Sequence, residues 1–404
     1  MRKYRFKAFN VPVAIFSIVL ALMVVGLVGV YSGSASIAGY EQRLRARRSL
    51  AAAEIDPAVQ YPAARYHAAT YLKKQMIWAG LGLIGMGAFY LFDYRHLRRW
   101  SFWIMAACFL ATCMVWIPGI GHEANGASRW LRLGPYSMQP SEFAKLGLII
   151  YMAKMLDDRR RYIQSFFSGV LPAMIVTGAL ALIIVMEPDF GSAFVLCLII
   201  FGMWLCGEMR WFHLGGLAFA AVPAAVAAIL MAPYRVRRFV AFFSDDPEIL
   251  MREGYQLYQS LVAIGSGGAF GLGLGQSVQK YHFLSASHTD FIFSIIAEEV
   301  GFAGTTVVIL LFAALVMLGW WVALNTSDLF GSLLATGITL MVFLGASINM
   351  GVALGLLPTK GLALPLVSYG GSSLLVTLAS MGILMNIAQR QFSLMSPRVE
   401  EPEG

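Results

Sequence analysis

The sequence predicts an all-α, polytopic integral membrane protein of about ten transmembrane helices, from its composition and from the length of its apolar segments. Of the 404 residues, 58% are hydrophobic and only 13% are charged, whereas about 25% of residues are charged in an average soluble domain. A helix needs about 20 mostly apolar residues to cross the hydrocarbon core of a bilayer. Such segments lie near 11–31, 75–92, 101–119, 141–156, 167–186, 190–206, 212–232, 291–322, 329–353 and 368–389. A transmembrane barrel would show alternating segments of about ten residues instead, and the sequence has none.

The first apolar segment follows a basic N-terminus, Met-Arg-Lys-Tyr-Arg-Phe-Lys. It is longer than the roughly 7–15 apolar residues of a secretory signal peptide. We therefore expect an uncleaved first helix that starts in the cytoplasm. The four cysteines fall inside predicted spans and lack metal-ligand spacing with nearby histidines, so we interpret them as small buried hydrophobic residues.

The basic residues beside the spans predict the orientation. If the helices simply alternate, the clusters at 2–7, 95–99 and 159–161 and Arg210 share one side, which the excess of Lys and Arg in cytoplasmic loops identifies as the inside. Against this, the segment 32–74 carries seven basic residues and falls outside, although long segments cross largely regardless of charge. The formal net charge of +8 fits contact with anionic membrane lipids and does not by itself indicate nucleic acid.

Two segments between the spans are too long to be simple connections. Residues 32–74 are rich in Ala, Arg and Tyr without strong periodicity, so we expect partial helix there and assign no function. Residues 233–289 combine basic residues, an acidic patch, an amphipathic stretch and a glycine-rich run. Loops this long are usually functional or disordered, and the aromatic content favours a large, partly ordered extracytoplasmic loop before the eighth helix. The predicted organisation is one transmembrane domain over 1–396 and a cytoplasmic tail over 397–404.

Polar residues collect on the outer face, where three shorter segments join this loop: 120–140, the turn at 187–189 and 354–367. The leading candidate for chemistry on that face is Asp290, in Ser-His-Thr-Asp-Phe-Ile-Phe, where the polar loop meets the eighth span. A carboxylate at a membrane boundary is costly unless it has a function. We expect a general base, and N-capping of the helix by the same side chain is an equally open alternative.

Helical spacing places Ser294 and Glu298 on the same broad face as Asp290 if the helix starts there, and turns Glu299 away. For Glu298 we favour a structural partner to a buried donor over a catalytic role, and we count it, with Glu142 and Lys145, among the candidate substrate contacts. The cations of the loop are candidates for phosphate binding, because Arg offers planar paired donors and Lys a compact charge. For each one alone, contact with lipid head groups is the simpler interpretation. This set comprises Arg235, Arg237, Arg238 and Lys280, with His288 near the aspartate.

Glu142 and Lys145 open the fourth span, directly after Gln139-Pro140. Their spacing puts them on one side of a helix, which favours a structural salt bridge that also lines a cavity. The glycine run 265–275 invites comparison with a nucleotide-binding loop, but no strand or βαβ unit surrounds it, so close backbone approach explains it better. The small residues around Ser368 permit close helix packing, and their hydroxyls are candidates for ligand contact.

Several long motifs follow one another along the chain: Gln-Pro-Ser-Glu-Phe-Ala-Lys (139–145), Glu-Pro-Asp-Phe-Gly-Ser-Ala (187–193), Ala-Pro-Tyr-Arg-Val-Arg-Arg (232–238), Gly-Tyr-Gln-Leu-Tyr-Gln-Ser (254–260), Gly-Leu-Gly-Gln-Ser-Val-Gln-Lys (273–280), His-Thr-Asp-Phe-Ile-Phe (288–293), Glu-Glu-Val-Gly-Phe (298–302) and Lys-Gly-Leu-Ala-Leu-Pro-Leu-Val-Ser-Tyr-Gly-Gly-Ser-Ser (360–373). In this order they resemble the SEDS (FtsW/RodA/SpoVE) family of peptidoglycan polymerases, and they are more similar to its division branch, FtsW, than to its elongation branch, RodA.

The resemblance implies an inverting glycosyltransferase in the bacterial inner membrane that polymerises lipid II on the extracytoplasmic face and releases undecaprenyl pyrophosphate. Asp290 matches the family's essential aspartate, and its neighbours His288 and Thr289 are expected substrate contacts. A sugar hydroxyl needs a base, and a diphosphate leaving group needs cations more than an acid, so one carboxylate with Arg and Lys is a sensible set. A divalent cation such as Mg²⁺ could share the diphosphate charge, although no metal-ligand cluster stands out.

Two other functions compete with polymerisation. A lipid II flippase would favour charges at the bilayer midplane and inverted repeats, neither of which the sequence shows clearly. A non-catalytic scaffold would only recruit a transpeptidase. The family resemblance also implies such a partner, a class B penicillin-binding protein that cross-links the new strands.

Overall fold

The computed structural model describes most of the chain: residues 10–53, 65–124, 127–134, 136–162, 164–207, 209–244, 246–280, 284 and 288–395. Each of the ten predicted spans has a helix in this part: α1 (Val11–Ala53), α2 (Arg65–Leu91), α3 (Tyr94–Cys113), α4 (Pro140–Asp158), α5 (Leu171–Met186), α6 (Phe190–Cys206), α7 (Trp211–Leu230), α11 (Ile292–Asn325), α12 (Leu329–Ala353) and α13 (Gly371–Met395). Seven described helices are long and apolar enough to cross a membrane, and α6 is apolar but shorter. The predicted all-α polytopic class is confirmed.

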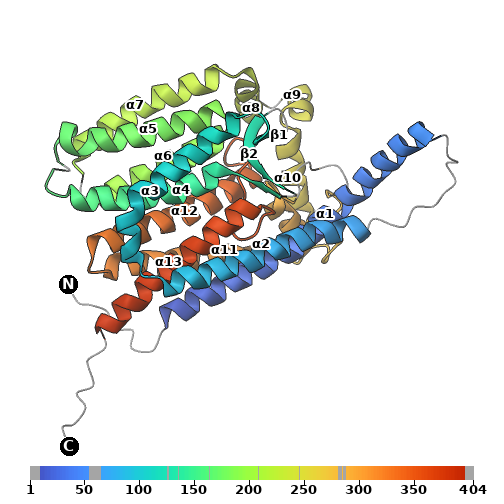
Figure 1. Ribbon diagram of the computed structural model, residues 1–404. Coiled ribbons are helices and arrows are strands. Elements are labelled where there is room, and N and C mark those ends of the chain that lie inside the picture. The colour runs from blue at the N-terminus through green and yellow to red at the C-terminus, as the bar shows by residue number, and fades with distance from the viewer. Residues whose placement is uncertain are drawn as a thin grey trace, which may run out of the picture.

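The long helices run side by side, and the start of α1 and the end of α13 lie at the same end of the bundle (Figure 1). The opposite end, which we call the sheet end, carries the remaining elements. These are a 3-10 turn (Met114–Trp116), β1 (Gly121–Ala124), β2 (Ala127–Leu133), β3 (Tyr136–Met138), α8 (Pro233–Phe243), α9 (Pro247–Arg252) and α10 (Tyr255–Ser266). A π-helical turn over Phe166–Val170 precedes α5.

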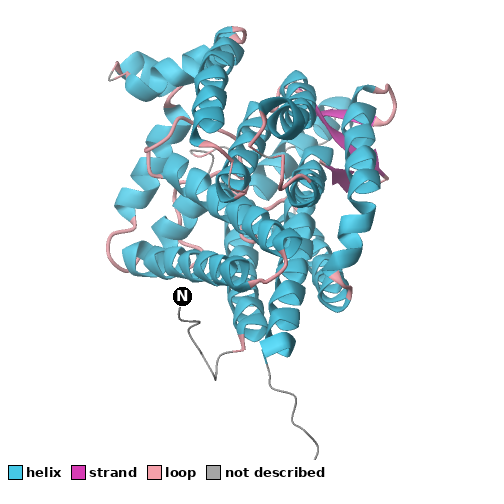
Figure 2. Ribbon diagram, turned by 90° about the vertical axis from the view of Figure 1, so that its left-hand side faces the viewer, coloured by secondary structure: helices cyan, strands magenta, loops and turns pink. Residues whose placement is uncertain are grey.

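The strands form a small antiparallel sheet in the order β1-β2-β3, with β2 paired to both neighbours. Figure 2 shows this sheet beside the much larger helical bundle. From the sequence, 120–140 is predicted only as a polar connection, because strands of three to seven residues are too short for a clear alternating pattern. In the described part of the two long segments, 233–289 contains α8, α9 and α10, and the partial helix expected in 32–74 is present up to Ala53 and again from Arg65.

Helix α12 lies at the centre of the bundle and packs against α11, α6 and α4. Small residues bring these helices close together. A Cβ on Gly337 would lie 2.5 Å from Ile149, and one on Gly319 of α11 would lie 2.3 Å from Thr339. Because lipid provides no hydrophobic force between helices, such close van der Waals packing is a principal source of their association.

Helix α11 is interrupted at Gly301, which has φ 68° and ψ −168°. The glycine run after α10 satisfies the backbone around this break. The N–H groups of Leu272 and Gly273 donate to the carbonyls of Glu298 and Glu299, each at 3.0 Å. In return, the N–H groups after the break donate to carbonyls of the run at 2.9 and 3.0 Å. Irregular backbone at membrane depth is tolerated where protein supplies its hydrogen bonds, so close approach is the role of these glycines.

We expect Gly301→Ala to destabilise the protein by about 2 kcal/mol or more, because positive φ is strained for alanine and its Cβ would lie 2.2 Å from the Gly271 nitrogen. Thermal unfolding in detergent measures the loss. The matched control is Gly85→Ala in α2, where a Cβ would meet nothing within 4 Å and alanine favours helix. Equal melting temperatures for the two variants would contradict this role of Gly301.

Candidate active site

Asp290 lies in a turn just before α11 and is not part of the helix. The N-cap position of α11 is Phe291, and no side chain caps this helix end. The interpretation of Asp290 as a helix cap is therefore wrong. The face that we drew from Asp290 through Ser294 is wrong for the same reason, since the helical spacing starts only at Ile292.

Three consecutive backbone carbonyls fix this turn. The carbonyl of His288 accepts from the N–H of Tyr369 at 2.9 Å. The carbonyl of Thr289 accepts from the hydroxyl of Ser368 at 2.6 Å. The carbonyl of Asp290 accepts from the side-chain amide of Asn349 at 2.8 Å. The turn is thus bound to α12 and to the segment before α13.

Asn349 and Ser368 are both buried, and each also binds the 361–369 segment. The Asn349 amide donates a second hydrogen bond to the Leu362 carbonyl at 2.6 Å, and the Ser368 hydroxyl accepts from the Leu364 N–H at 2.8 Å. Ser368 was predicted as a ligand contact, but here its hydroxyl donates to one backbone group and accepts from another. We assign it to the support of the turn.

The Asp290 carboxyl group is half-buried beside the backbone of Gly361, where a Cβ would lie 3.0 Å from Oδ2. Burial raises the pKa of Asp290 from 3.8 to about 6, an increase that the positive charges of Arg238 and Arg129 limit. Asp189 adds a smaller rise in this pKa. A carboxyl group with this pKa is charged at neutral pH and yet basic enough to take a proton.

Arg129 and Asp189, which the sequence analysis did not single out, connect this carboxylate to the rest of the sheet end. Arg129, on β2, donates through Nε to the Glu187 carbonyl at 3.2 Å and through Nη2 to the Pro188 carbonyl. Asp189 caps α6 by accepting from the Ser192 N–H at 3.1 Å. Neither residue stands out in the sequence, because their proximity to Asp290 arises only through tertiary structure.

Glu187 lies fully buried in the 187–189 turn between α5 and α6. Neither of its carboxyl oxygens has a hydrogen-bond partner among the described residues. Burial raises its pKa to about 8, and the neighbouring charge of Asp189 adds to the rise. Glu187 is therefore largely protonated at neutral pH. The Asp290 carboxyl group is the more readily ionised of the two.

The predicted cations fall into different environments. Arg238 is exposed on α8 and acts on Asp290 through its charge. Arg235, also on α8, donates to the Ala228 carbonyl at 2.7 Å and places its guanidinium carbon 5.3 Å from the ring centroid of Phe190. Arg237 lies 3.9 Å from Glu253 in an exposed pair, an arrangement that contributes little to stability.

His288 is packed among aromatic rings. Its ring centroid lies 5.3 Å from that of Tyr71 and 5.5 Å from that of Tyr369. Burial lowers its pKa to about 4, so His288 is neutral at physiological pH. His288 therefore cannot bind phosphate as a cation, and its inclusion with the basic residues of the loop is wrong. It packs against aromatic rings instead.

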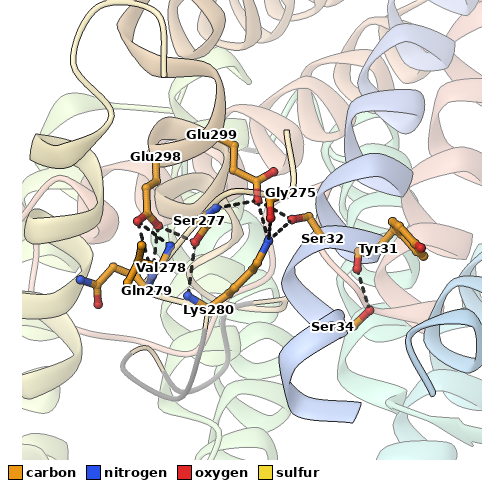
Figure 3. A network of polar contacts seen from close by, with 10 residues as sticks. All are labelled: Tyr31, Ser32, Ser34, Gly275, Ser277, Val278, Gln279, Lys280, Glu298 and Glu299. Carbon is orange, nitrogen blue, oxygen red and sulfur yellow. Dashed lines mark hydrogen bonds and ion pairs between the residues drawn. The ribbon is translucent and has the colours of Figure 1, made fainter. Parts of the chain in front are cut away.

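Lys280 is buried, with a side-chain exposure of 2%, in the network of Figure 3. Its ammonium donates to Glu299 Oε1 at 3.1 Å, to the Gly275 carbonyl at 2.6 Å and to the Ser32 hydroxyl at 3.0 Å. Lysine has three donors, and these oxygens can take all of them. This arrangement supports a structural role that ties α1 to the break in α11, in place of the phosphate contact expected from sequence.

Glu298 lies in the same network and accepts from the Val278 N–H at 2.9 Å and from the Ser277 hydroxyl (Figure 3). Our interpretation of Glu298 as a structural partner of buried donors is confirmed by these contacts. Glu299, which we expected to turn away from the face of Asp290, has its carboxylate on the same 275–280 segment as Glu298. Together they attach the end of the loop to α11.

Glu142 and Lys145 form the predicted ion pair, with Nζ 2.7 Å from Oε1. They line a small cavity of about 30 Å³, with Leu362, Ser373 and Thr377 among its other walls. A space of this size holds about two water molecules. The prediction of a salt bridge that lines a cavity is confirmed, and Leu362 connects this cavity to the segment that abuts Asp290.

Among the residues that the structure describes, no group of three or more His, Cys, Asp or Glu side chains is placed to hold a metal ion.

One protein family matches most of the chain. The family of FtsW, RodA and SpoVE, described as "Cell cycle protein", matches residues 57–392. Stage V sporulation protein E of Bacillus subtilis (strain 168) is 38% identical over 374 residues, which cover 92% of this chain and 95% of the relative. The probable peptidoglycan glycosyltransferase FtsW of Geobacter sp. (strain M18) is 40% identical over 322 residues, which cover 79% of this chain and 87% of the relative.

Solved structures share the fold. A chain of the structure described as "Structural coordination of polymerization and crosslinking by a peptidoglycan synthase complex" has a TM-score of 0.73 and 29% identity, and the match covers 96% of this chain and 99% of that one. The rod shape determining protein RodA of Thermus thermophilus has a TM-score of 0.65 and 27% identity, over 96% of this chain and 99% of that one.

We expect Lys280→Met or Glu299→Gln alone to destabilise the protein by about 3–5 kcal/mol, because each leaves a buried group without its partner. The double variant should recover a large part of this loss. A double-mutant cycle of unfolding free energies in detergent measures the coupling. Additive losses would show that the two side chains do not depend on each other.

Proposed function

This chain belongs to the FtsW/RodA/SpoVE family of cell cycle proteins, and we propose that it polymerises lipid II with Asp290 as the general base. It is an FtsW-like, multi-pass membrane protein and a peptidoglycan glycosyltransferase that serves division or sporulation. The observation that carries the assignment of the base is the half-buried Asp290 carboxyl group, with its raised pKa and with cations nearby.

The proposed reaction joins two lipid-linked sugars. The Asp290 carboxylate takes the proton of the acceptor's 4-hydroxyl as its oxygen bonds to the anomeric carbon of the donor. The bond from that carbon to the diphosphate oxygen breaks, and its electron pair leaves with undecaprenyl pyrophosphate. Attack from the opposite side inverts the anomeric centre. One carboxylate is enough for this inversion, because the diphosphate is a good leaving group without a general acid, unlike the sugar alkoxide released in glycoside hydrolysis.

Cations on the sheet end support the charge of the departing diphosphate. The positive charges of Arg238 and Arg129 lower the pKa of Asp290, which places both guanidinium groups close to this carboxylate. They would also attract a diphosphate bound beside it. Arg235 lies one helical turn before Arg238 on α8. We therefore retain Arg235 and Arg238 as substrate contacts and add Arg129. Thr289, whose side chain lowers the pKa of Asp290 through a hydrogen bond, is retained beside the base.

We infer the orientation from the basic residues. Arg98 pairs with Asp157 and Asp158, which joins the start of α3 to the end of α4 at the end opposite the sheet. Concentration of Lys and Arg at that end favours the cytoplasm, so the sheet end with Asp290 faces outward from the inner membrane. The single domain over 1–396 with a cytoplasmic tail over 397–404 remains part of this proposal, and the tail lies outside the described residues.

A class B penicillin-binding protein is the proposed partner. Support comes from the structural neighbour, which is part of a peptidoglycan synthase complex whose description couples polymerization to crosslinking. The flippase and the scaffold remain the competing functions. A flippase would move lipid II without producing glycan, and a scaffold would do neither.

We expect Asp290→Asn to reduce glycan polymerisation by about 10²- to 10⁴-fold, which is the usual contribution of a positioned base. The measurement is polymer formation by purified protein from lipid II, with and without the transpeptidase partner. Asp158→Asn is the matched control, because Asp158 is 42% exposed at the opposite end. Full activity of Asp290→Asn would show that Asp290 is not the general base. Translocation of lipid II without polymer formation would favour the flippase.

We also expect activity to be lost at acid pH, as Asp290 becomes protonated. Asp290 acts as a base only when ionised, and its pKa is raised to about 6. On the acid side, the kcat/KM value for lipid II should therefore begin to fall only below about pH 7 and should fall about tenfold per pH unit well below 6. An acid limb centred near pH 4, the ordinary range of a carboxyl group, would show that the burial of Asp290 does not tune the reaction.

A further inference from the structure

Lys360, in the segment between α12 and α13, has surroundings unlike those of the other buried lysines. Its Nζ lies 3.8 Å from the ring centroid of Phe194 and 5.2 Å from that of Phe190. The side chain is half-buried. Among the described residues, no carboxylate forms an ion pair with it. Aromatic faces attract an ammonium through their quadrupoles, so they hold this charge in position without neutralising it.

Lys145 and Lys280 differ from Lys360 because each has a carboxylate partner. Lys145 is paired with Glu142 at 2.7 Å, and Lys280 with Glu299 at 3.1 Å. A buried charge is normally compensated in this way, because removal from water is costly. For Lys360 the cost appears as a pKa that burial lowers to about 8. An anion that enters from outside the chain would supply the missing compensation.

The position of Lys360 indicates where that anion lies. The next residue, Gly361, abuts the Asp290 carboxyl group. Arg235 of α8 contacts the Phe190 ring as well, with its guanidinium carbon 5.3 Å from the ring centroid. Both cations therefore lie around one phenyl ring at the start of α6, a helix capped by Asp189. Each charge lies within 5.3 Å of the Phe190 ring centroid, so the two charges are separated by no more than about twice that distance.

We propose that Lys360 and Arg235, positioned on Phe190, bind the diphosphate group of the prenyl-linked donor. This inference rests on the proposed function and adds a binding residue that the sequence analysis did not identify. A diphosphate has two anionic phosphate groups, and Lys360 and Arg235 can each bind one of them. The arginine supplies paired planar donors and the lysine a compact charge. The backbone link through Gly361 then keeps the leaving group close to the carboxylate that activates the acceptor.

Farnesyl diphosphate is a suitable probe, because it carries the diphosphate and a prenyl chain without any sugar. Its affinity is measured by titration calorimetry on the catalytically impaired Asp290→Asn protein, so that binding is separated from turnover. Farnesyl monophosphate is the comparison ligand. We expect the diphosphate to bind more tightly, Lys360→Gln to weaken it by about tenfold or more, and Lys360→Arg to retain most of the affinity.

The matched control is Lys154→Gln, which removes a half-buried lysine about 20 Å along α4 from the start of that helix. It should leave binding unchanged. Unchanged diphosphate affinity in Lys360→Gln, or equal affinity for both probes, would overturn the inference. Melting temperatures for each variant show that the protein is folded, and retention in Lys360→Arg excludes a purely structural loss.

The pH profile of the active protein gives a second readout. Loss of the Lys360 charge should lower kcat/KM above about pH 8, whereas kcat should fall less because bound diphosphate holds the proton. Lys360→Arg, whose charge persists at high pH, should lack this alkaline limb, and persistence of the limb would contradict the inference. Polymerisation lost in Asp290→Asn but unaffected in Lys360→Gln would leave the base intact and reject only the diphosphate site.

Discussion

The hydrogen bonds that hold the backbone of the 288–290 turn are the constraint on which the site depends. A half-buried carboxyl group acts as a base only if its environment stays fixed, since a mobile loop would let it move into water and return its pKa to the ordinary range. Here the carbonyls of His288, Thr289 and Asp290 accept from Tyr369, Ser368 and Asn349. Because two of these donors are buried side chains, the position of the base is coupled to the packing of α12 against the loop before α13.

The buried charges divide into two kinds. The networks around Lys280 and Lys145 are internally compensated: each ammonium meets a carboxylate, and Glu298 meets backbone N–H groups. These networks hold the glycine run and α4 in place. Two groups beside the proposed site, Asp290 and Lys360, are only partly compensated. Asp290 and Lys360 both have pKa values moved toward neutrality by burial, which is typical of sites completed by a ligand.

The sequence predicted the ten helices well, because a segment of about twenty apolar residues is a strong signal. It also identified Asp290, since a carboxylate at a membrane boundary is conspicuous. The helical face was drawn from Asp290, two residues before α11 begins at Ile292, and that error produced the wrong face. The ion pair of Glu142 and Lys145 was predictable because its partners are three residues apart. The Lys280 contact with Ser32 was not, because 248 residues separate them. Arg129 and Lys360 are ordinary basic residues until folding brings them near Phe190 and Asp290.

An experimental structure of the Asp290→Asn protein with lipid II bound would locate the general base and the diphosphate site together. We predict that the acceptor's 4-hydroxyl lies within hydrogen-bond distance of residue 290 and that the donor diphosphate lies against Arg235 and Lys360. Sugars bound at the opposite end of the bundle, or a diphosphate remote from both cations with residue 290 facing lipid, would contradict it.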